Sequence, residues 1–346
     1  MKKLIFIFSI FLVSTTVYSQ ISNLSLSDTY EAYRDSLKKV PYPWHLPILG
    51  AKTRAMGFDI PYPNGFMVTY GHSSQELILN DLMVGFAEDN LVNVDRVARF
   101  QSINAKVDAV IARYDFWLLP FVNVFGLAGR IQSNTDVSLG LPFEMTFQAH
   151  SVGTTVGWGT VVAAGIGPLV MTGNFVQTWT FVPSLSSPSR TIVVDGRVGY
   201  MLRFKNPERN MVFLVGAQYL GLNPQSNGNT NLEKLLGITP EKKQNAADQL
   251  DDWFVDLSDA EKEVFGGIYD GLSGWLKNED PAKLYYSFTK RMYYPVSMTL
   301  GVNFQLNHRY QFNAIYTFLG SREQVVLGFS YRFGWRGKNY LQGVTL

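Results

Sequence analysis

The chain has 346 residues, of which 46% are hydrophobic, 17% charged and 14% aromatic, and it contains no Cys. Its 30 Lys and Arg nearly balance 28 Asp and Glu, so the composition is neither that of a disordered chain nor that of a nucleic-acid-binding protein. The absence of Cys excludes disulfide scaffolds and thiolate metal sites. A mean hydropathy near zero is too low for a helical membrane protein, but it fits a chain that faces both lipid and water.

Residues 1–19 have the features of an export signal. Two lysines follow the initiating Met, and residues 4–13 form an apolar run that is too short to span a bilayer. The mature protein is expected to start at Gln20, and an N-terminal membrane anchor is the less favoured alternative. After this signal, the most apolar segment contains several Gly and a Pro, which favour strands and a turn over a spanning helix.

Strict alternation of apolar and polar residues is the decisive pattern. One such run has its apolar positions at Val296, Met298, Leu300, Val302, Phe304 and Leu306. Alternate side chains of a strand point to opposite faces, so each run has one apolar and one polar face. A strand of a soluble sandwich has about 5–6 residues, whereas a transmembrane strand needs about 9–11. The longer runs therefore favour a membrane barrel, with apolar side chains toward lipid and polar ones toward the lumen.

The pattern predicts an all-β fold, a closed antiparallel transmembrane β-barrel of about twelve strands with a helical extracellular insert. The expected strands are Gly65–Ser73, Glu76–Phe86, Ser102–Phe116, Phe121–Gln132, Thr135–Gln148, Gly153–Ile166, Leu169–Phe181, Thr191–Phe204, Met211–Tyr219, Val296–Leu306, Tyr310–Phe318 and Glu323–Phe333. Short turns, one of them at Asn134, alternate with longer connections, as periplasmic turns alternate with external loops in bacterial barrels. The stretch 87–101 is the one long connection expected on the inner side.

Aromatic residues gather at both predicted membrane interfaces, as expected for the girdles of a barrel. Those expected near the outer edge are Phe116, Trp117, Trp179, Phe181, Tyr219, Tyr293, Tyr294 and Phe318. Together with the signal, the strand run and the final segment Phe329–Phe333, they make the chain resemble Gram-negative outer-membrane β-barrel proteins. The resemblance implies a place in the cell outer membrane and recognition of the last strand by the outer-membrane assembly machinery. The chain departs from this pattern by continuing for residues 334–346.

Two segments do not follow the barrel pattern. Residues 20–57, with a helix expected at Ser27–Lys39, form either an N-terminal periplasmic tail or a partial plug before the barrel at 58–333. The insert 229–287 is expected to be helical, because Pro240 follows Thr239 as a helix opening and Ser258 starts a capping box. Its apolar faces pack on each other, cover the pore as a lid, or contact the outer-leaflet lipid.

Charged residues mark the predicted lumen. The lumen-lining candidates are Lys106, Asp108, Glu144, Asp195, Arg197, Arg203 and Arg332, beside Arg113 and Asp115. Charges inside a barrel can select solutes by sign, or they can form salt bridges that close the barrel. The mixed signs favour closure, and they indicate neither a preference for anions nor one for cations. No spacing typical of a metal site or nucleotide loop is present, and no cofactor is expected.

His72, Ser74 and Glu76 are the weak catalytic candidates. On a strand they would share one face, where His72 could act as a base toward Ser74 and Glu76 could orient the imidazole. A His-x-Ser pairing also occurs in outer-membrane phospholipases and lipid A deacylases, a resemblance that implies lipid hydrolysis. Ser73 and Ser74 fit a turn equally well, and a turn would break the shared face. The favoured interpretation is therefore that the protein is not an enzyme.

The leading hypothesis is an outer-membrane channel or transporter for a small or hydrophobic solute. The alternative is a non-transporting barrel, filled inside, that uses its helical insert as a docking surface, and the third hypothesis is an outer-membrane lipid hydrolase. Expected partners are outer-membrane lipid and lipopolysaccharide, the assembly machinery and a protein partner at the insert, but no nucleic acid.

Overall fold

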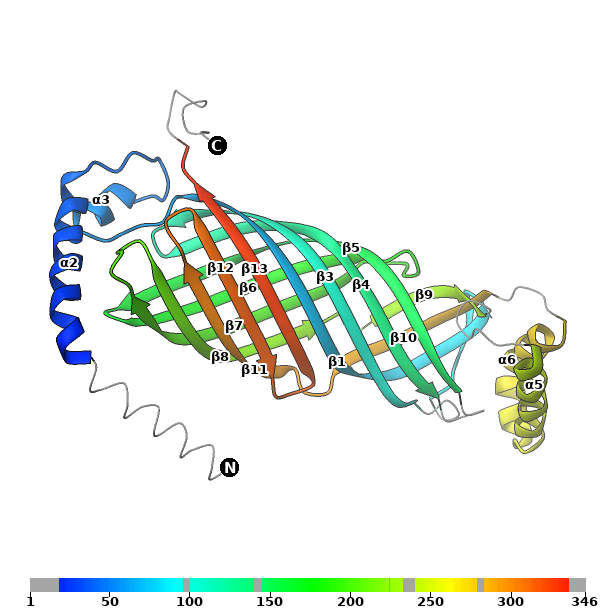
Figure 1. Ribbon diagram of the computed structural model, residues 1–346. Helices are drawn as coiled ribbons and strands as arrows, with labels where there is room; N and C mark the ends of the chain where they lie inside the picture. Colours follow the sequence, from blue (N-terminus) through cyan, green and yellow to red (C-terminus); the bar gives the residue numbers. More distant parts are fainter. Residues whose placement is uncertain are drawn as a thin grey trace.

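Ten strands of the computed structural model close into an antiparallel barrel (Figure 1). The structure describes residues 19–95, 100–139, 145–223, 225–232, 240–278 and 283–335, so the predicted signal lies outside the described residues except for Ser19. In chain order the barrel strands are β1 (Asn64–Ala87), β3 (Phe100–Leu119), β4 (Val122–Leu139), β5 (Met145–Ile166), β6 (Leu169–Phe181), β7 (Ser189–Arg203), β8 (Asn210–Leu222), β11 (Val296–Gln305), β12 (Tyr310–Phe318) and β13 (Arg322–Phe333). The last strand pairs with the first, which confirms the predicted closed antiparallel barrel.

The prediction of twelve strands was wrong because three expected turns, at Ser73–Ser74, at Asn134 and at 149–152, lie inside continuous strands. In addition, the expected strand Thr135–Gln148 is divided between β4, which ends at Leu139, and β5, which begins at Met145. β1 runs through Ser73 and Ser74, and Ser74 pairs with Lys106 of β3. Asn134 likewise lies inside β4, opposite Lys106 on one side and His150 of β5 on the other. Three turns are lost and one break is gained, so the number of strands falls from twelve to ten and stays even. The long connection from β1 to β3 moves from the predicted inner side to the opposite end of the barrel.

The two ends of the barrel differ in their connections. We call the end at Asn64 and Phe333, which is toward the left in Figure 1, the lower end, and the opposite end, toward α5 and α6, the upper end. The connections at the lower end are the short segments 120–121, 167–168, 204–209 and 306–309, whereas the upper end carries the long segment 223–295. Phe116 and Trp117, predicted near the outer edge, lie at the lower end, because Phe116 pairs with Asn64.

An apolar belt surrounds the barrel on its outer face. Its large side chains are 44% to 60% exposed on nine of the ten strands: Val68, Val110, Trp158, Met171, Val198, Phe213, Leu300, Phe312 and Leu327. On the inner face the alternating residues are buried and polar, as Thr299 and Thr317 show, both 0% exposed. Such an arrangement is stable where lipid covers the outer face, because exposed apolar side chains then avoid water.

The wall formed by β1, β3, β4 and β5 rises above the belt at the upper end. These strands have 24, 20, 18 and 22 residues, whereas about 9–11 suffice to cross a membrane. β10 (Lys283–Met292) pairs with the upper part of β1, β9 (Gln225–Asn231) pairs with β10, and β2 (Asn90–Asn93) pairs with the tip of β1. The two ends of the predicted helical insert are therefore strands, which its weak alternation did not indicate.

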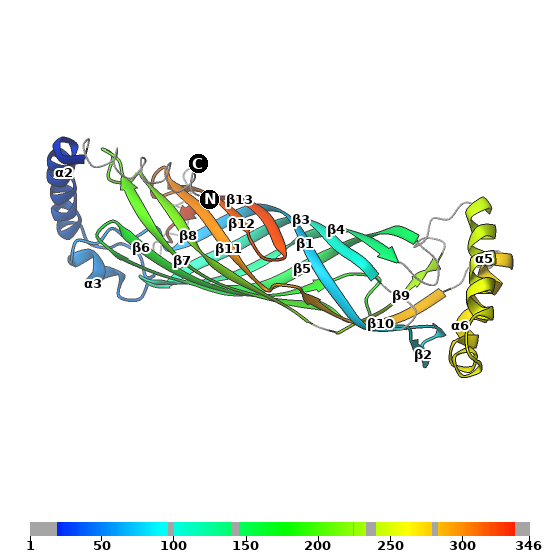
Figure 2. The ribbon, with the colours of Figure 1, turned by 90° about the horizontal axis from the view of Figure 1, so that it is seen from below.

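Two helices complete the insert, α5 (Pro240–Val255) and α6 (Asp259–Asn278). They pack on each other through buried residues such as Leu250 and Trp275, and Phe86 from the tip of β1 joins this cluster. Ser258 and Glu261 form the predicted capping box, in which the Ser258 backbone N–H and hydroxyl both donate to the Glu261 carboxylate. Figures 1 and 2 place the pair beyond the tips of β9 and β10, so it packs on the tip of the wall rather than inside the lumen.

The N-terminal segment lies at the lower end (Figure 1). Its helix α2 (Ser19–Lys39) ends where the lysines predicted an end, and a short helix α3 (Gly50–Ala55) was not predicted. The segment contacts the lower rim, where the Tyr30 hydroxyl donates to the Phe204 carbonyl and the Ile48 N–H donates to the Leu118 carbonyl. No helix within the described ranges is long and apolar enough to cross a membrane.

Candidate functional site

Four side chains, three of them buried and that of Arg113 partly buried, meet in the lower lumen and form what we call the lower cluster: Arg113, Asp115, Asn123 and Arg332. Asp115 is 1% exposed and Arg332 5%. The Asp115 carboxylate is 3.1 Å from Arg332 Nη2 and 3.6 Å from Arg113 Nε, and it accepts a hydrogen bond of 2.6 Å from the Asn123 amide. The two guanidinium groups thus share one carboxylate, which closes this level of the lumen with polar side chains.

Space for the lower cluster comes from a glycine. A Cβ atom at Gly65 would lie 2.8 Å from Asp115 Oδ2 and 3.0 Å from Arg332 Nη1. A side chain there would push the ion pair apart, because real Cβ atoms do not approach other heavy atoms so closely. Gly65 is therefore the residue of β1 that allows the lower cluster to form.

A second ion pair occupies the middle of the lumen on β7. Asp195 is 4% exposed, and its carboxylate is 3.1 Å from Arg197 Nη2 and accepts a hydrogen bond of 2.9 Å from the Asn174 amide. Side chains that line a wide, water-filled pore would be exposed to that water. Burial of these polar groups therefore shows that side chains fill the lumen at this level in the resting structure.

The predicted lumen residues divide into three groups. Asp195, Arg197 and Arg332 lie on the inner face, and Glu144 lies outside the described residues. Arg203 is exposed at the lower rim, where its guanidinium donates to the Gly167 carbonyl. Residues missed by the prediction are Asn123, which reads as an ordinary polar strand residue, and the cations near the upper end described below.

The prediction that Lys106 and Asp108 line the lumen was wrong. They share the outer face of β3 with Val110, and their side chains are 53% and 39% exposed. Lys106 Nζ is 3.6 Å from the carboxylate of Asp136, on the outer face of β4. The prediction assumed that polar strand residues point into the lumen, which holds only within the lipid belt. Above the belt the outer face meets water, so polar residues such as Lys106 and Asp108 can lie on that face.

His72 and Ser74 do share one face of β1, because no turn separates them. Asp108 Oδ1 accepts hydrogen bonds from His72 Nδ1 at 2.8 Å and from the Tyr70 hydroxyl at 2.7 Å. The neighbour that orients the imidazole is thus Asp108 on β3, not Glu76. The Ser74 hydroxyl donates to Asn104 at 2.9 Å instead of donating to His72. The nucleophile–base contact that a hydrolase needs is not formed in this arrangement.

The inner face of the rising wall carries an apolar patch on β1 and β3, where the outer face of these strands is polar. Ile103 and Ala105 of β3 are 5% and 3% exposed and point inward, and they pair with Leu77 and Gln75 of β1 or lie next to them. Val107 continues the same inner face toward the middle of the barrel. This apolar surface lies between the upper end of the barrel and the levels of the lumen that the two ion-pair groups fill.

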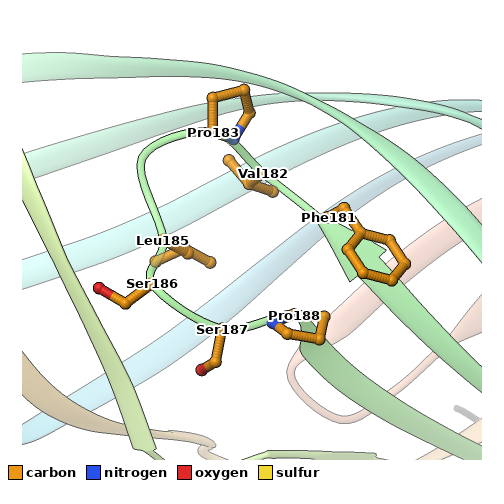
Figure 3. A pocket seen from close by; sticks show the side chains of 7 residues that line it. All are labelled: Phe181, Val182, Pro183, Leu185, Ser186, Ser187 and Pro188. Carbon is orange, nitrogen blue, oxygen red and sulfur yellow. The ribbon is translucent and has the colours of Figure 1, made fainter.

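The loop between β6 and β7 borders this upper region. It encloses a hollow of about 250 Å³, shown in Figure 3, whose lining is Phe181, Val182, Pro183, Leu185, Ser186, Ser187 and Pro188. The loop is tied to the insert, because the Ser186 N–H donates to the Asn227 carbonyl and the Tyr286 hydroxyl donates to the Ser184 carbonyl. These bonds connect β9 and β10, which extend the sheet beyond the edge of β1, to the loop between β6 and β7.

Comparison with solved structures finds Gram-negative outer-membrane barrels. The beta domain of the Bordetella autotransporter BrkA is 7% identical with a TM-score of 0.37, and the match covers 78% of this chain and 100% of that chain. The translocator domain of the autotransporter NalP from Neisseria meningitidis is 11% identical with a TM-score of 0.35, over 90% and 98%. An outer membrane channel from Pseudomonas putida F1 is 9% identical with a TM-score of 0.30, over 79% and 96%.

These similarities concern the barrel architecture alone, which resembles that of Gram-negative outer-membrane β-barrels as the sequence predicted. No family model and no curated protein matches the chain.

Proposed function

We propose that this protein is a transporter of the cell outer membrane that passes a small or hydrophobic solute through its lumen and is closed at rest. The apolar inner face of the rising wall, with Leu77, Ile103 and Ala105, carries the proposal. A barrel that only anchors a surface domain has no need of an apolar lining at its mouth. Transport is proposed rather than lipid hydrolysis, and the Ser74 hydroxyl donates to Asn104 while His72 contacts Asp108.

The upper end faces the cell exterior in this proposal. Bacterial barrels have short periplasmic turns and longer external loops, and all four connections at the lower end are short. A protease added to intact cells should then cut the insert between Glu241 and Asp252 on α5. Protection of this segment, while another surface protein is cut, would contradict the orientation.

Entry of the solute into the periplasm requires that the lower cluster opens. The single carboxylate of Asp115 holds both guanidinium groups of the cluster, so a shift of Arg332 or of the N-terminal segment bound to it would open the lumen. Arg332 Nε donates to the Tyr62 carbonyl at 3.0 Å, which couples the cluster to that segment. Purified protein in planar bilayers should accordingly show no steady open conductance.

Two tryptophan variants test whether the solute uses the lumen. Gly71 of β1 points inward, and a Cβ there would meet its nearest atom at 3.8 Å, so Gly71→Trp can fill the passage without a clash at the backbone. Gly196 of β7 points outward, and a Cβ there meets nothing within 4 Å, so Gly196→Trp adds the same bulk on the lipid side. Uptake of an apolar fluorescent dye by expressing cells should fall in the first variant and stay unchanged in the second.

Both variants must reach the outer-membrane fraction and show heat-modifiable gel mobility before uptake is compared. Equal uptake by the two variants would contradict passage through the lumen. It would favour the second candidate, a filled barrel that presents α5 and α6 as a docking surface. The buried polar side chains in the lumen are the observation that supports this candidate. Val255 and Val264 of these helices are 70% and 53% exposed, and they are the residues at which a partner would be sought.

A further inference from the structure

Two cations at the upper end of the lumen have no acidic partner among the described residues. Lys290 of β10 donates from Nζ to the Ser189 hydroxyl at 3.2 Å, and burial lowers the pKa of its ammonium group. Arg322 at the start of β13 donates to the side-chain oxygens of Gln218 and Gln324, and its buried Nε has no hydrogen-bond partner. We call Lys290 and Arg322 the mouth cations.

The strand register places both mouth cations on one line of the inner face. β10 continues the line of β13 along the edge of β1, where Gln75 is opposite Arg322, Leu77 opposite Met292 and Leu79 opposite Lys290. These alternate positions share one face, and four residues of β1 separate the two cations by about 13 Å. The buried Met292 lies between them.

Both side chains reach across the mouth of the lumen. Ser189 begins β7 and Gln218 lies on β8, whereas Lys290 and Arg322 flank β1. The cations therefore lie in the path of any solute that enters between these strands. Their neutral partners satisfy hydrogen-bond donors but leave the positive charges without a counter-ion, which is an unfavourable state for a partly buried charge unless an anion is supplied.

We propose that Lys290 and Arg322 bind the anionic head group of an amphiphilic solute, whose apolar tail lies on the inner face of the rising wall. An inorganic anion would not use the apolar surface formed by Leu77, Met292 and Ile103, and a neutral solute would not use the charges. A singly charged aliphatic anion uses both. This inference rests on the proposed function, because it names the class of solute that the passage takes.

Binding of decanoate tests the proposal. The full chain is placed in nanodiscs of phosphatidylcholine, and the heat of binding of decanoate or decanol is measured after subtraction of protein-free nanodiscs. A hydrogen bond to a charged group has a larger net effect than a neutral one, so decanoate should bind about tenfold or more tightly than decanol. Lys290→Met and Arg322→Gln should each reduce this preference, and the double variant should remove it.

Arg291→Gln is the matched control, because Arg291 precedes Met292 on the opposite face of β10 and is exposed. It should keep the preference for decanoate. The proposal is overturned if the double variant retains the preference, if Arg291→Gln loses as much as the mouth variants, or if inorganic phosphate displaces decanoate at equal concentration. Failure here leaves the tryptophan test intact, since Gly71→Trp reports passage of a neutral dye, and passage can hold without an anionic head group.

Discussion

The lower cluster and the mouth cations use the same residue types in opposite ways. In the lower cluster the guanidinium groups of Arg113 and Arg332 share the buried carboxylate of Asp115. At the mouth, Lys290 and Arg322 contact only hydroxyl and amide groups among the described residues. Both sets lie on the inner face of one barrel, so their difference comes from the partners that each level provides.

This difference separates closure from binding. A buried ion pair holds its geometry because loss of either partner leaves an uncompensated charge. A cation with neutral partners is free to exchange them for an anion, since the exchange gains a charge-assisted hydrogen bond. The lower cluster is thus suited to keep the lumen shut, and the mouth cations are suited to receive a ligand.

The largest expected effect comes from Asp115→Asn. This change keeps the shape of the side chain but leaves both guanidinium groups of the lower cluster without an acid, which should lower the free energy of unfolding by about 3–5 kcal/mol. Urea unfolding of the refolded protein in lipid vesicles measures the effect. Lys290→Met is the matched change at the mouth and should cost less than about 1 kcal/mol, because it removes an unpaired charge. Equal losses would break the comparison.

The next effect tests which face of the wall meets lipid. Leu300→Arg places a charge on the outer face near the middle of the belt, which should cost about 2–4 kcal/mol and reduce assembly. Asn303→Arg on the same strand points into the lumen and should be tolerated. The amount of heat-modifiable protein in the outer-membrane fraction measures both. A one-residue slip of register would reverse the two results.

Sequence patterns predicted the barrel well where lipid imposes a strict rule. β11 begins at Val296 and β12 spans Tyr310–Phe318 as predicted, because these short strands lie almost wholly within the belt. Each turn that was predicted wrongly, at Ser73–Ser74, at Asn134 and at 149–152, lies on the rising wall. There both faces are mixed, and polar residues that resemble a turn continue a strand in water.

The candidate site was predictable only in part for the same reason. Asp115 and Arg332 were found because polar residues within the belt point inward. Lys290 was missed because it lies between the predicted helical insert, which ends at 287, and the predicted strand that begins at Val296, where no strand was expected. Arg322 was missed because the charge of a single residue at a strand start does not show whether an acid faces it. Arg322 contacts the neutral Gln218 instead of an acid because β13 and β8 face each other across the lumen.

A smaller effect concerns the attachment of the N-terminal segment to the lower rim. His308 lies between Asp59, whose carboxylate is 2.8 Å from Nε2, and Glu208, whose carboxylate is 3.3 Å from Nδ1. Burial lowers the pKa of His308, but the hydrogen bond and charge of Asp59, together with Glu208, outweigh it, so the pKa is raised. Tyr33 also contacts this group, and Arg54 opposes the protonated form.

A raised pKa means that protonated His308 stabilises the attachment. The stabilisation is complete below the pKa of an unfolded histidine, about 6.5, and is lost as the pH rises through the higher folded value. Because the chain has no Cys, a spin label at Lys52→Cys on α3 reports the attachment alone. Its mobility should increase as the pH rises from 6 to about 9, and His308→Gln should remove this dependence. A label that stays equally immobile at both pH values would show that the ion pairs do not hold the segment.

The smallest effect is expected on the outer face of the wall. Lys106→Gln breaks the contact with Asp136, but both side chains are exposed, at 53% and 37%. Water and salt screen such a pair, so the free energy of unfolding should change by less than about 1 kcal/mol, and the preference for decanoate should not change. Removal of a charge inside the lumen, as in Asp115→Asn, is expected to have a large effect. Comparison of the two variants therefore shows whether the effect depends on where the charge lies. A loss as large as that of Asp115→Asn would place Lys106 inside the lumen after all, and the reversal of faces above the belt would then be wrong.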